Sequence, residues 1–208
     1  ALEQLSQSLP KAEENKPEIK EALATETPKN TSPQESILLA QPLTQNDVLK
    51  KYRLNKNLSN LDLSNLDLSK MNLSGATFEN SILENTIFEG SILNNAKFIN
   101  SRLNNSNFTN ASLVSVIFSE CYAAFTIFNQ ANFTSTSIDN SDFSSCGFNT
   151  AVLDKAKLEQ SNFESSNFTK SQAIQLASTH CIFTNCNLTH ANFSKSILAQ
   201  ADLSNANV

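Results

Sequence analysis

A large apolar side chain, nearly always Leu or Phe, occupies every fifth position of the chain from Leu58 to Val208. This register contains 31 central positions, and only Ala123, Ala173 and Ser178 are not large and apolar. The residue two places before a central position is usually small, and the residue after it is usually Ser or Thr. A strict internal repeat of this kind constrains the whole fold, so it is interpreted before any local pattern.

A period of five matches neither the turn of a helix nor the alternation of a strand, so neither element keeps these side chains on one face. They stay together if each unit of five forms one side of a square coil, with about 20 residues in a turn. Stacked coils then pair through backbone hydrogen bonds at a spacing of about 4.8 Å. Ordering five residues costs about 5 to 10 kcal/mol, whereas burying one Leu or Phe returns about 1.5 to 3 kcal/mol. A single unit therefore does not fold alone.

The repeated words at residues 131–134 (ANFT), 191–194 (ANFS) and 201–204 (ADLS) resemble the pentapeptide-repeat family. The resemblance covers residues 56–208 and implies an all-β solenoid, a right-handed quadrilateral β-helix of about eight coils. Residues 171–179, with their Gln-Leu pair, resemble a short interruption found in many family members. We therefore expect a break in the solenoid near residues 171–180.

Residues 20 apart in this register fall in one column of adjacent coils. Thirteen of the 14 Phe residues occupy central positions and are interpreted as core, with Phe125 the exception. Aromatic rings stacked in a column attract one another, so we expect an internal ladder on one face. Its members are Phe88, Phe108, Phe128, Phe148 and Phe168.

The chain before the repeats divides into two parts. Residues 1–43 hold all five prolines and few apolar side chains, which predicts a flexible or partly helical tail. Residues 44–47 (TQND) form a capping-box pattern that opens a short helix through Tyr52, within a capping helix and entry turn over 44–55. Val48, Leu49 and Tyr52 are expected to cover the first coil, because an open solenoid end exposes apolar centres and unpaired strand edges.

The repeat pattern is still running at Val208, so either the array belongs to a longer chain or its open end docks onto a partner. An uncovered coil end favours association with another chain. We hypothesise an end-to-end homodimer through the C-terminal coil, which a monomeric mass in light scattering at high concentration would exclude.

The residues required for catalysis are scarce. There are only 3 Gly and no phosphate-binding Gly loop, and paired carboxylates are not evident. The two histidines, His180 and His190, are ten residues apart and therefore on opposite sides of a square coil, so they cannot share a metal. We predict a protein that is not an enzyme, with no catalytic residues, no cofactor and no metal site.

All four cysteines occupy the small position two places before a central residue: Cys121, Cys146, Cys181 and Cys186. We interpret them as structural core thiols, since their spacing lacks the paired pattern of a zinc site. Reduced thiols favour a cytoplasmic protein, or one delivered into a host cytosol. No apolar run approaches the about 18 residues of a membrane helix, so no span is predicted.

The outward position directly before each central residue is usually polar, and its exceptions suggest a binding surface. Phe125 also lies out of register, beside the small centre Ala123. The predicted partner-binding residues are Ile82, Ile87, Ile117, Tyr122, Phe125 and Ile127. In the alternative interpretation Phe125 turns inward to fill the space that Ala123 leaves, and the β-branched residues merely suit an extended backbone.

The leading interpretation is a non-catalytic protein–protein interaction or scaffold module with an unidentified protein partner. A bacterial effector is one example of such a module. A second follows from the resemblance, because some family members mimic DNA and bind topoisomerases such as gyrase. DNA carries one negative charge per about 1.7 Å, whereas residues 54–208 hold 12 acidic and 8 basic residues, and Glu79 and Glu159 share a column four coils apart. Direct nucleic-acid binding is not expected without a basic face. A purely structural spacer is the third alternative.

Overall fold

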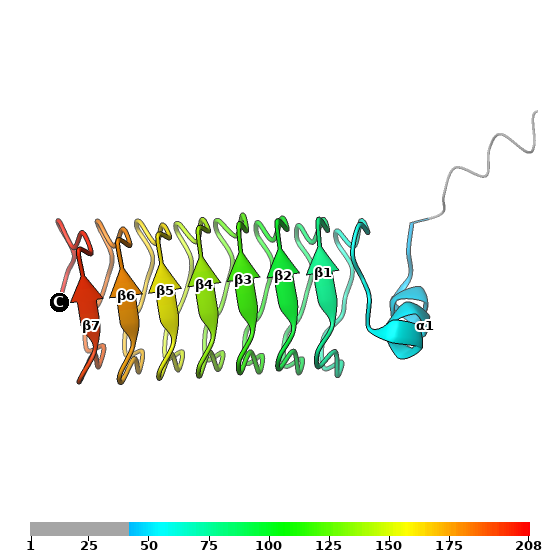
Figure 1. Ribbon diagram of the computed structural model, residues 1–208, viewed down its shortest axis with the longest axis horizontal. Helices are drawn as coiled ribbons and strands as arrows, with labels where there is room; N and C mark the ends of the chain where they lie inside the picture. Colours follow the sequence, from blue (N-terminus) through cyan, green and yellow to red (C-terminus); the bar gives the residue numbers. More distant parts are fainter. Residues whose placement is uncertain (1–41) are drawn as a thin grey trace, which may run out of the picture. The chain divides into compact units, whose positions relative to one another are not determined.

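The computed structural model describes residues 42–208, which form one helix followed by a parallel β-solenoid (Figure 1). The strands are β1 (Thr77–Glu79), β2 (Lys97–Ile99), β3 (Ile117–Ser119), β4 (Ser137–Asp139), β5 (Lys157–Glu159), β6 (Ala177–Thr179) and β7 (Ile197–Ala199). Each strand pairs in parallel with the next, from β1 to β7, and each residue pairs with its equivalent one coil later, as Phe78 does with Phe98. The predicted all-β solenoid is confirmed.

Each coil has four sides, which we number as faces 1 to 4 in chain order. Face 1 carries β1 to β7, and the other three are held by single parallel bridges such as Ile82 to Arg102 on face 2, Ile87 to Asn107 on face 3 and Ile92 to Ser112 on face 4. Central amides donate to carbonyls of the next coil, as Leu103 does to Tyr122. The lateral backbone is therefore paired within the solenoid, as a quadrilateral β-helix requires.

The corners between faces are tight turns with a left-handed residue. The amide three residues after a centre donates to the central carbonyl, as Ala131 does to Phe128 at 3.1 Å. The residue two places after each centre has positive φ at every corner from Asn60 to Asn205. Asn tolerates this conformation better than bulky residues do, which explains why it is the commonest residue at this corner position.

The interior contains stacked aromatic columns beside columns of buried leucine. In the predicted ladder the ring centroids of Phe88 and Phe108 are 4.6 Å apart, and those of Phe128 and Phe148 are 5.2 Å apart. The ladder continues to Phe168 at 4.6 Å and is confirmed. A second stack on face 1, which the sequence reasoning did not single out, joins Phe78, Phe98 and Phe118 at 4.7 and 4.9 Å. The two stacks meet edge to face, a favourable aromatic geometry.

The small side chains two places before the centres also have a hydrogen-bonding role. Most hydroxyls at this position donate to the carbonyl of a central residue in the preceding coil, as Thr126 Oγ1 does to Leu103 at 2.8 Å. Three thiols occupy the same place: Cys121 Sγ lies 3.2 Å from the Phe98 carbonyl, Cys146 Sγ 3.0 Å from that of Ala123, and Cys186 Sγ 2.9 Å from that of Phe163. Cysteine thus substitutes for serine as a small buried donor.

The break expected near residues 171–180 is absent from the structure. Gln172 keeps bridges to both neighbouring coils, and β6 pairs with both β5 and β7. The small centre Ser178 still points inward and is fully buried. Leu176, two places earlier, is buried as well and supplies the apolar volume that Ser178 lacks. Exchanging the large and small positions therefore preserves the coil.

The helix α1 (Gln45–Asn55) covers the first coil, as predicted. Thr44 is its N-cap and forms a capping box with Asp47. Val48 is fully buried, and the Tyr52 hydroxyl donates to the Ser74 carbonyl at 3.0 Å. Figure 1 shows α1 at one end of the row of strands. The tail expected over residues 1–43 lies outside the described residues, except for its last two positions.

Candidate functional site

The six predicted partner-binding residues lie on the outside of the solenoid and are spread over three faces. Ile117 lies on face 1, Ile82 and Tyr122 on face 2, Ile87 and Ile127 on face 3, and Phe125 at the corner between faces 2 and 3. Four of them belong to a single coil, and we call this set the apolar collar: Ile117, Tyr122, Phe125 and Ile127. Ile82 and Ile87 lie two coils away.

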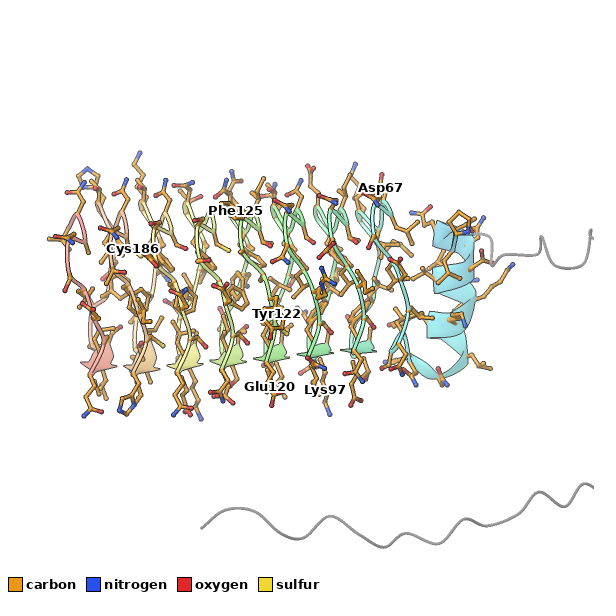
Figure 2. All side chains as sticks on the ribbon, turned by 90° about the horizontal axis from the view of Figure 1, so that it is seen from above. Asp67, Lys97, Glu120, Tyr122, Phe125 and Cys186 are labelled. Carbon is orange, nitrogen blue, oxygen red and sulfur yellow. The ribbon has the colours of Figure 1, made fainter. Side chains whose placement is uncertain are left out.

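The aromatic members of the collar are the most exposed. Phe125 is 63% exposed and Tyr122 is 57% exposed. Figure 2 looks onto face 2, with Tyr122 near its middle, Phe125 along one edge and Glu120 along the other. Ile87, Ile117 and Ile127 are also exposed, whereas Ile82 is only half-buried. The structure therefore places five of the six side chains where a partner can reach them.

Phe125 points outward, so the alternative interpretation in which it fills the space beside Ala123 is wrong. That space is taken from within the core. The ring of Phe143, one coil further along the column of Ala123, lies 5.4 Å from the Phe118 ring and 5.6 Å from the Phe128 ring. The small centre is thus packed by neighbouring coils, and the interior does not need Phe125.

The backbone of Phe125 adopts a conformation that its side chain disfavours. Its φ is 60°, in the left-handed region, where bulky residues are rare. In the same corner column Asn105 precedes it, and asparagine is better suited to this φ. Phe125 is the one large apolar side chain among the corner residues from Asn60 to Asn205.

The outward isoleucines and Tyr122 also replace a hydrogen-bonding side chain. At many repeats the residue before the centre is Asn or Asp, and its Oδ1 accepts the amide of the residue after the centre, as in Asn107 with Thr109 at 2.9 Å and Asp142 with Ser144 at 3.0 Å. An isoleucine or tyrosine has no oxygen in that place. The collar therefore lacks a local bond that stabilises other repeats.

Outward apolar residues are not confined to the collar. Ile92, Ile182 and Ile197 are exposed in other coils. The collar differs because its apolar side chains on three consecutive faces of one coil are all exposed and include both exposed aromatic rings of the described residues; the outward Ile82, Ile87 and Ile92 also cover three faces of one coil, but Ile82 is half-buried. Sequence reasoning missed the ion pair between Arg102 and Glu84, 2.7 Å apart, which lies between Ile82 and Tyr122. Their sequence separation, nearly one coil, is the signal that could have revealed it.

The cysteines have no features of reactive groups. All four are free and buried, and burial raises the pKa of Cys121 to about 11 and that of Cys186 to about 11. Thiols with raised pKa values are poor nucleophiles. Within residues 42–208 no three His, Cys, Asp or Glu side chains gather as metal ligands. In the same part of the chain no helix has the length and apolar character to cross a membrane.

Substituting Phe125→Asn is expected to raise the free energy of unfolding by about 1 kcal/mol, because asparagine is less strained in the left-handed region. The gain is measured by urea denaturation followed by circular dichroism. As a matched control, Asn105→Phe in the same corner column should lower the stability by a similar amount. Destabilisation by Phe125→Asn would contradict the view that the ring contributes nothing to folding.

Comparison with known proteins supports the architecture. The family model for pentapeptide repeats matches in 8 copies, over residues 57–90, 91–123, 117–153 and 179–208. No curated protein sequence matches the chain. A trypsin-treated form of QnrB1, a plasmid-mediated fluoroquinolone resistance protein, has a TM-score of 0.53 and 21% identity, covering 72% of this chain and 75% of that one. HetL, a pentapeptide repeat protein involved in heterocyst differentiation regulation from the cyanobacterium Nostoc sp. strain PCC 7120, has a TM-score of 0.30 and 14% identity, covering 79% and 94%.

At this level of identity the likeness to QnrB1 shows a common fold and nothing more. The family match is more informative, because its segments span more than half of the chain and lie within the solenoid. The five-residue register, the four-sided coil and the buried Leu and Phe centres agree with it. The chain belongs to the pentapeptide-repeat family.

Proposed function

We propose that this protein is a non-catalytic binding module whose apolar collar contacts a protein partner. The observation that supports the proposal most strongly is the ring of Phe125, which is exposed and strained but not needed by the core. Tyr122 beside it is the other exposed aromatic side chain in the described solenoid. Aromatic residues are enriched among those that contribute most to protein interfaces.

The scaffold beneath the collar favours tight binding. The backbone of Tyr122 is bonded to both neighbouring coils, since its amide donates to Ser101 at 3.0 Å and its carbonyl accepts from Leu103 at 2.6 Å. The Phe125 amide donates to the Ser144 carbonyl of the next coil at 3.0 Å. A surface that is already ordered loses less conformational entropy on association than a loop does. Pentapeptide-repeat proteins are generally structural or binding modules without catalytic activity.

The proposal is tested by capturing partners with the native protein and with a Tyr122→Asn, Phe125→Asn double variant. We expect a protein captured by the native chain to be lost from the double variant by at least about tenfold, the effect of removing hot-spot side chains. Both substitutions introduce a residue common in this fold, so the variant should remain folded.

The matched control for the capture experiment is Ile182→Asn. Ile182 lies in the same face-2 column as Tyr122, three coils further on, and is exposed. This control should capture the partner as the native chain does. Equal capture by the native chain and the double variant would exclude the collar as the binding surface.

A topoisomerase-binding DNA mimic has less support. The structure does bring two carboxylates together, because Asp139 and Glu159 are register partners on face 1. The same column continues into Ser119 on one side and Thr179 on the other. DNA presents negative charge continuously, at one per about 1.7 Å, and this column does not. If the protein does not inhibit gyrase in a supercoiling assay, the DNA-mimic interpretation is excluded.

A purely structural spacer gives no reason for the collar, because polar residues at these positions would stabilise the coil better. We also propose that the protein acts in a reducing compartment, either the cytoplasm or a host cytosol that it enters as a bacterial effector. The four free cysteines support this proposal, since buried thiols remain reduced there.

A further inference from the structure

The outward column of face 2 alternates charged and apolar residues in a symmetrical order. Successive bridges join Asp62 to Ile82, Ile82 to Arg102, Arg102 to Tyr122 and Tyr122 to Asp142. We call these five residues the acid-flanked strip. Each of its two apolar side chains therefore has an aspartate one coil further outward along the axis.

The strip and its surroundings carry a negative charge. Arg102 is paired with Glu84 at 2.7 Å, which neutralises its guanidinium and leaves its aliphatic stem between Ile82 and Tyr122. The ion pairs among residues 42–208 are this one and Lys50 with Asp47, so Asp62 and Asp142 have no basic partner there. Face 2 and its two corners carry four acidic residues and one basic residue between positions 60 and 145, a net charge of −3.

The side of the solenoid offers a partner side chains but no strand edge. The Arg102 amide donates to the Ser81 carbonyl at 3.0 Å, and the Tyr122 amide donates to the Ser101 carbonyl at 3.0 Å. The Tyr122 carbonyl accepts from Leu103. With these groups already paired, a partner cannot bind by adding a strand. A helix suits such a surface, because its backbone is satisfied internally and it offers only side chains.

The spacing of the strip fits a helix that lies along the solenoid axis. Ile82 and Tyr122 are two coils apart, which corresponds to about 9.6 Å at the usual strand spacing. Residues seven apart on one face of an α-helix are separated by about 10.5 Å. Asp62 and Asp142 are four coils apart, about 19 Å, a length covered by about 13 helical residues.

Building on the proposed function, we infer that the acid-flanked strip binds a cationic amphipathic helix of the partner protein. Two apolar residues seven positions apart contact Ile82 and Tyr122, with the ring of Phe125 closing one side of the strip. A Lys or Arg about three residues beyond each apolar residue, near 4.5 Å along the helix, pairs with Asp62 or Asp142.

The probe for this inference is a fluorescein-labelled, alanine-based helical peptide of about 16 residues, because shorter helices are marginal in water. It carries leucine at positions 5 and 12 and arginine at positions 2 and 15. One comparison peptide has glutamate in place of both arginines, and another has its leucines five positions apart, on different helix faces. Fluorescence anisotropy at low salt should show the arginine peptide binding at least about tenfold more tightly than either comparison peptide, as two or more ion pairs and a matched register imply.

The protein variants identify the strip as the binding surface. The double variant Asp62→Asn, Asp142→Asn should weaken binding of the arginine peptide by about tenfold. Asparagine keeps the local bond to the following serine, as Asn107 does with Thr109, so the coil should be retained. Asp202→Asn is the matched control, because Asp202 lies in the same column three coils beyond Asp142 and should leave binding unchanged.

Two results would overturn the inference. One is equal binding of the arginine and glutamate peptides, or of the peptides with leucines seven and five apart. The other is arginine-peptide binding that the Asp62→Asn, Asp142→Asn variant leaves unchanged. Neither result bears on whether the collar binds a partner. The capture experiment decides that question, through the loss of partner capture in the Tyr122→Asn, Phe125→Asn double variant. Failure of the helix and failure of the collar are therefore separate outcomes.

Discussion

Replacing Phe148 with alanine is expected to lower the free energy of unfolding by about 3 to 5 kcal/mol, the range for a buried aromatic side chain. The Phe148 ring lies 5.2 Å from Phe128 and 4.6 Å from Phe168 within the predicted ladder. It also contacts rings of neighbouring columns, including Phe133 at 5.6 Å and Phe163 at 6.1 Å. Paired coils above and below limit how far the backbone can collapse into the cavity. Urea denaturation followed by circular dichroism measures the loss.

The control for this prediction is Phe148→Leu. Leucine is common at central positions and keeps most of the buried apolar volume, so the expected cost is about 1 kcal/mol. A loss below about 1.5 kcal/mol for Phe148→Ala would contradict a close-packed interior. It would mean that adjacent coils close around the missing ring.

Stability is expected to fall steeply as the pH rises from about 9 to about 11, because the core thiols stay protonated in the folded state. Burial raises the pKa of Cys121 from its ordinary value of 9.0 to about 11. Below pH 9 the thiol holds its proton in both states and has no effect. Between 9 and 11 the unfolded chain binds fewer protons, so Cys121 alone removes roughly 2 to 3 kcal/mol, at about 1.4 kcal/mol per pKa unit. Burial raises the pKa of Cys146, Cys181 and Cys186 as well.

A variant with all four cysteines changed to serine separates this effect from other titrations. Serine preserves the hydrogen bond to the central carbonyl, as Ser166 Oγ shows with Phe143 at 2.9 Å, and it does not ionise in this range. Thermal melting at several pH values should show a much flatter alkaline profile for the variant. An unchanged slope would show that the thiols do not cause the alkaline loss.

The core could be predicted from sequence because burial here follows the register rather than residue type. Ala123 and Ser178 are fully buried at central positions although neither is large and apolar. The orientation of Phe125 could not be predicted, since its position in the register allowed both an exposed corner ring and an inward turn. The choice depended on whether other rings reached the space beside Ala123, and that contact comes from Phe143, one coil later in the chain.

Other features required the coordinates or a closer use of the columns. The donor bonds from Thr126 and Cys146 reach carbonyls of the preceding coil, a separation that no local motif reveals. The expected break at residues 171–180 was wrong because it relied on resemblance and overlooked that Leu176 could fill the interior from the small position. The neighbouring pair Asp139 and Glu159 follows from the column register, because the two residues are 20 apart.

The four-sided coil determines how the chain tolerates changes in length. Removing one five-residue unit between Ile82 and Tyr122 would rotate every later side chain by a quarter turn, so that Tyr122 would no longer share a face with Ile82 and the ring columns would lose their alignment. Removing one whole coil would shorten the solenoid by a single layer and leave each face intact. Homologous chains with a similar recognition surface should therefore differ in length by whole coils across this region.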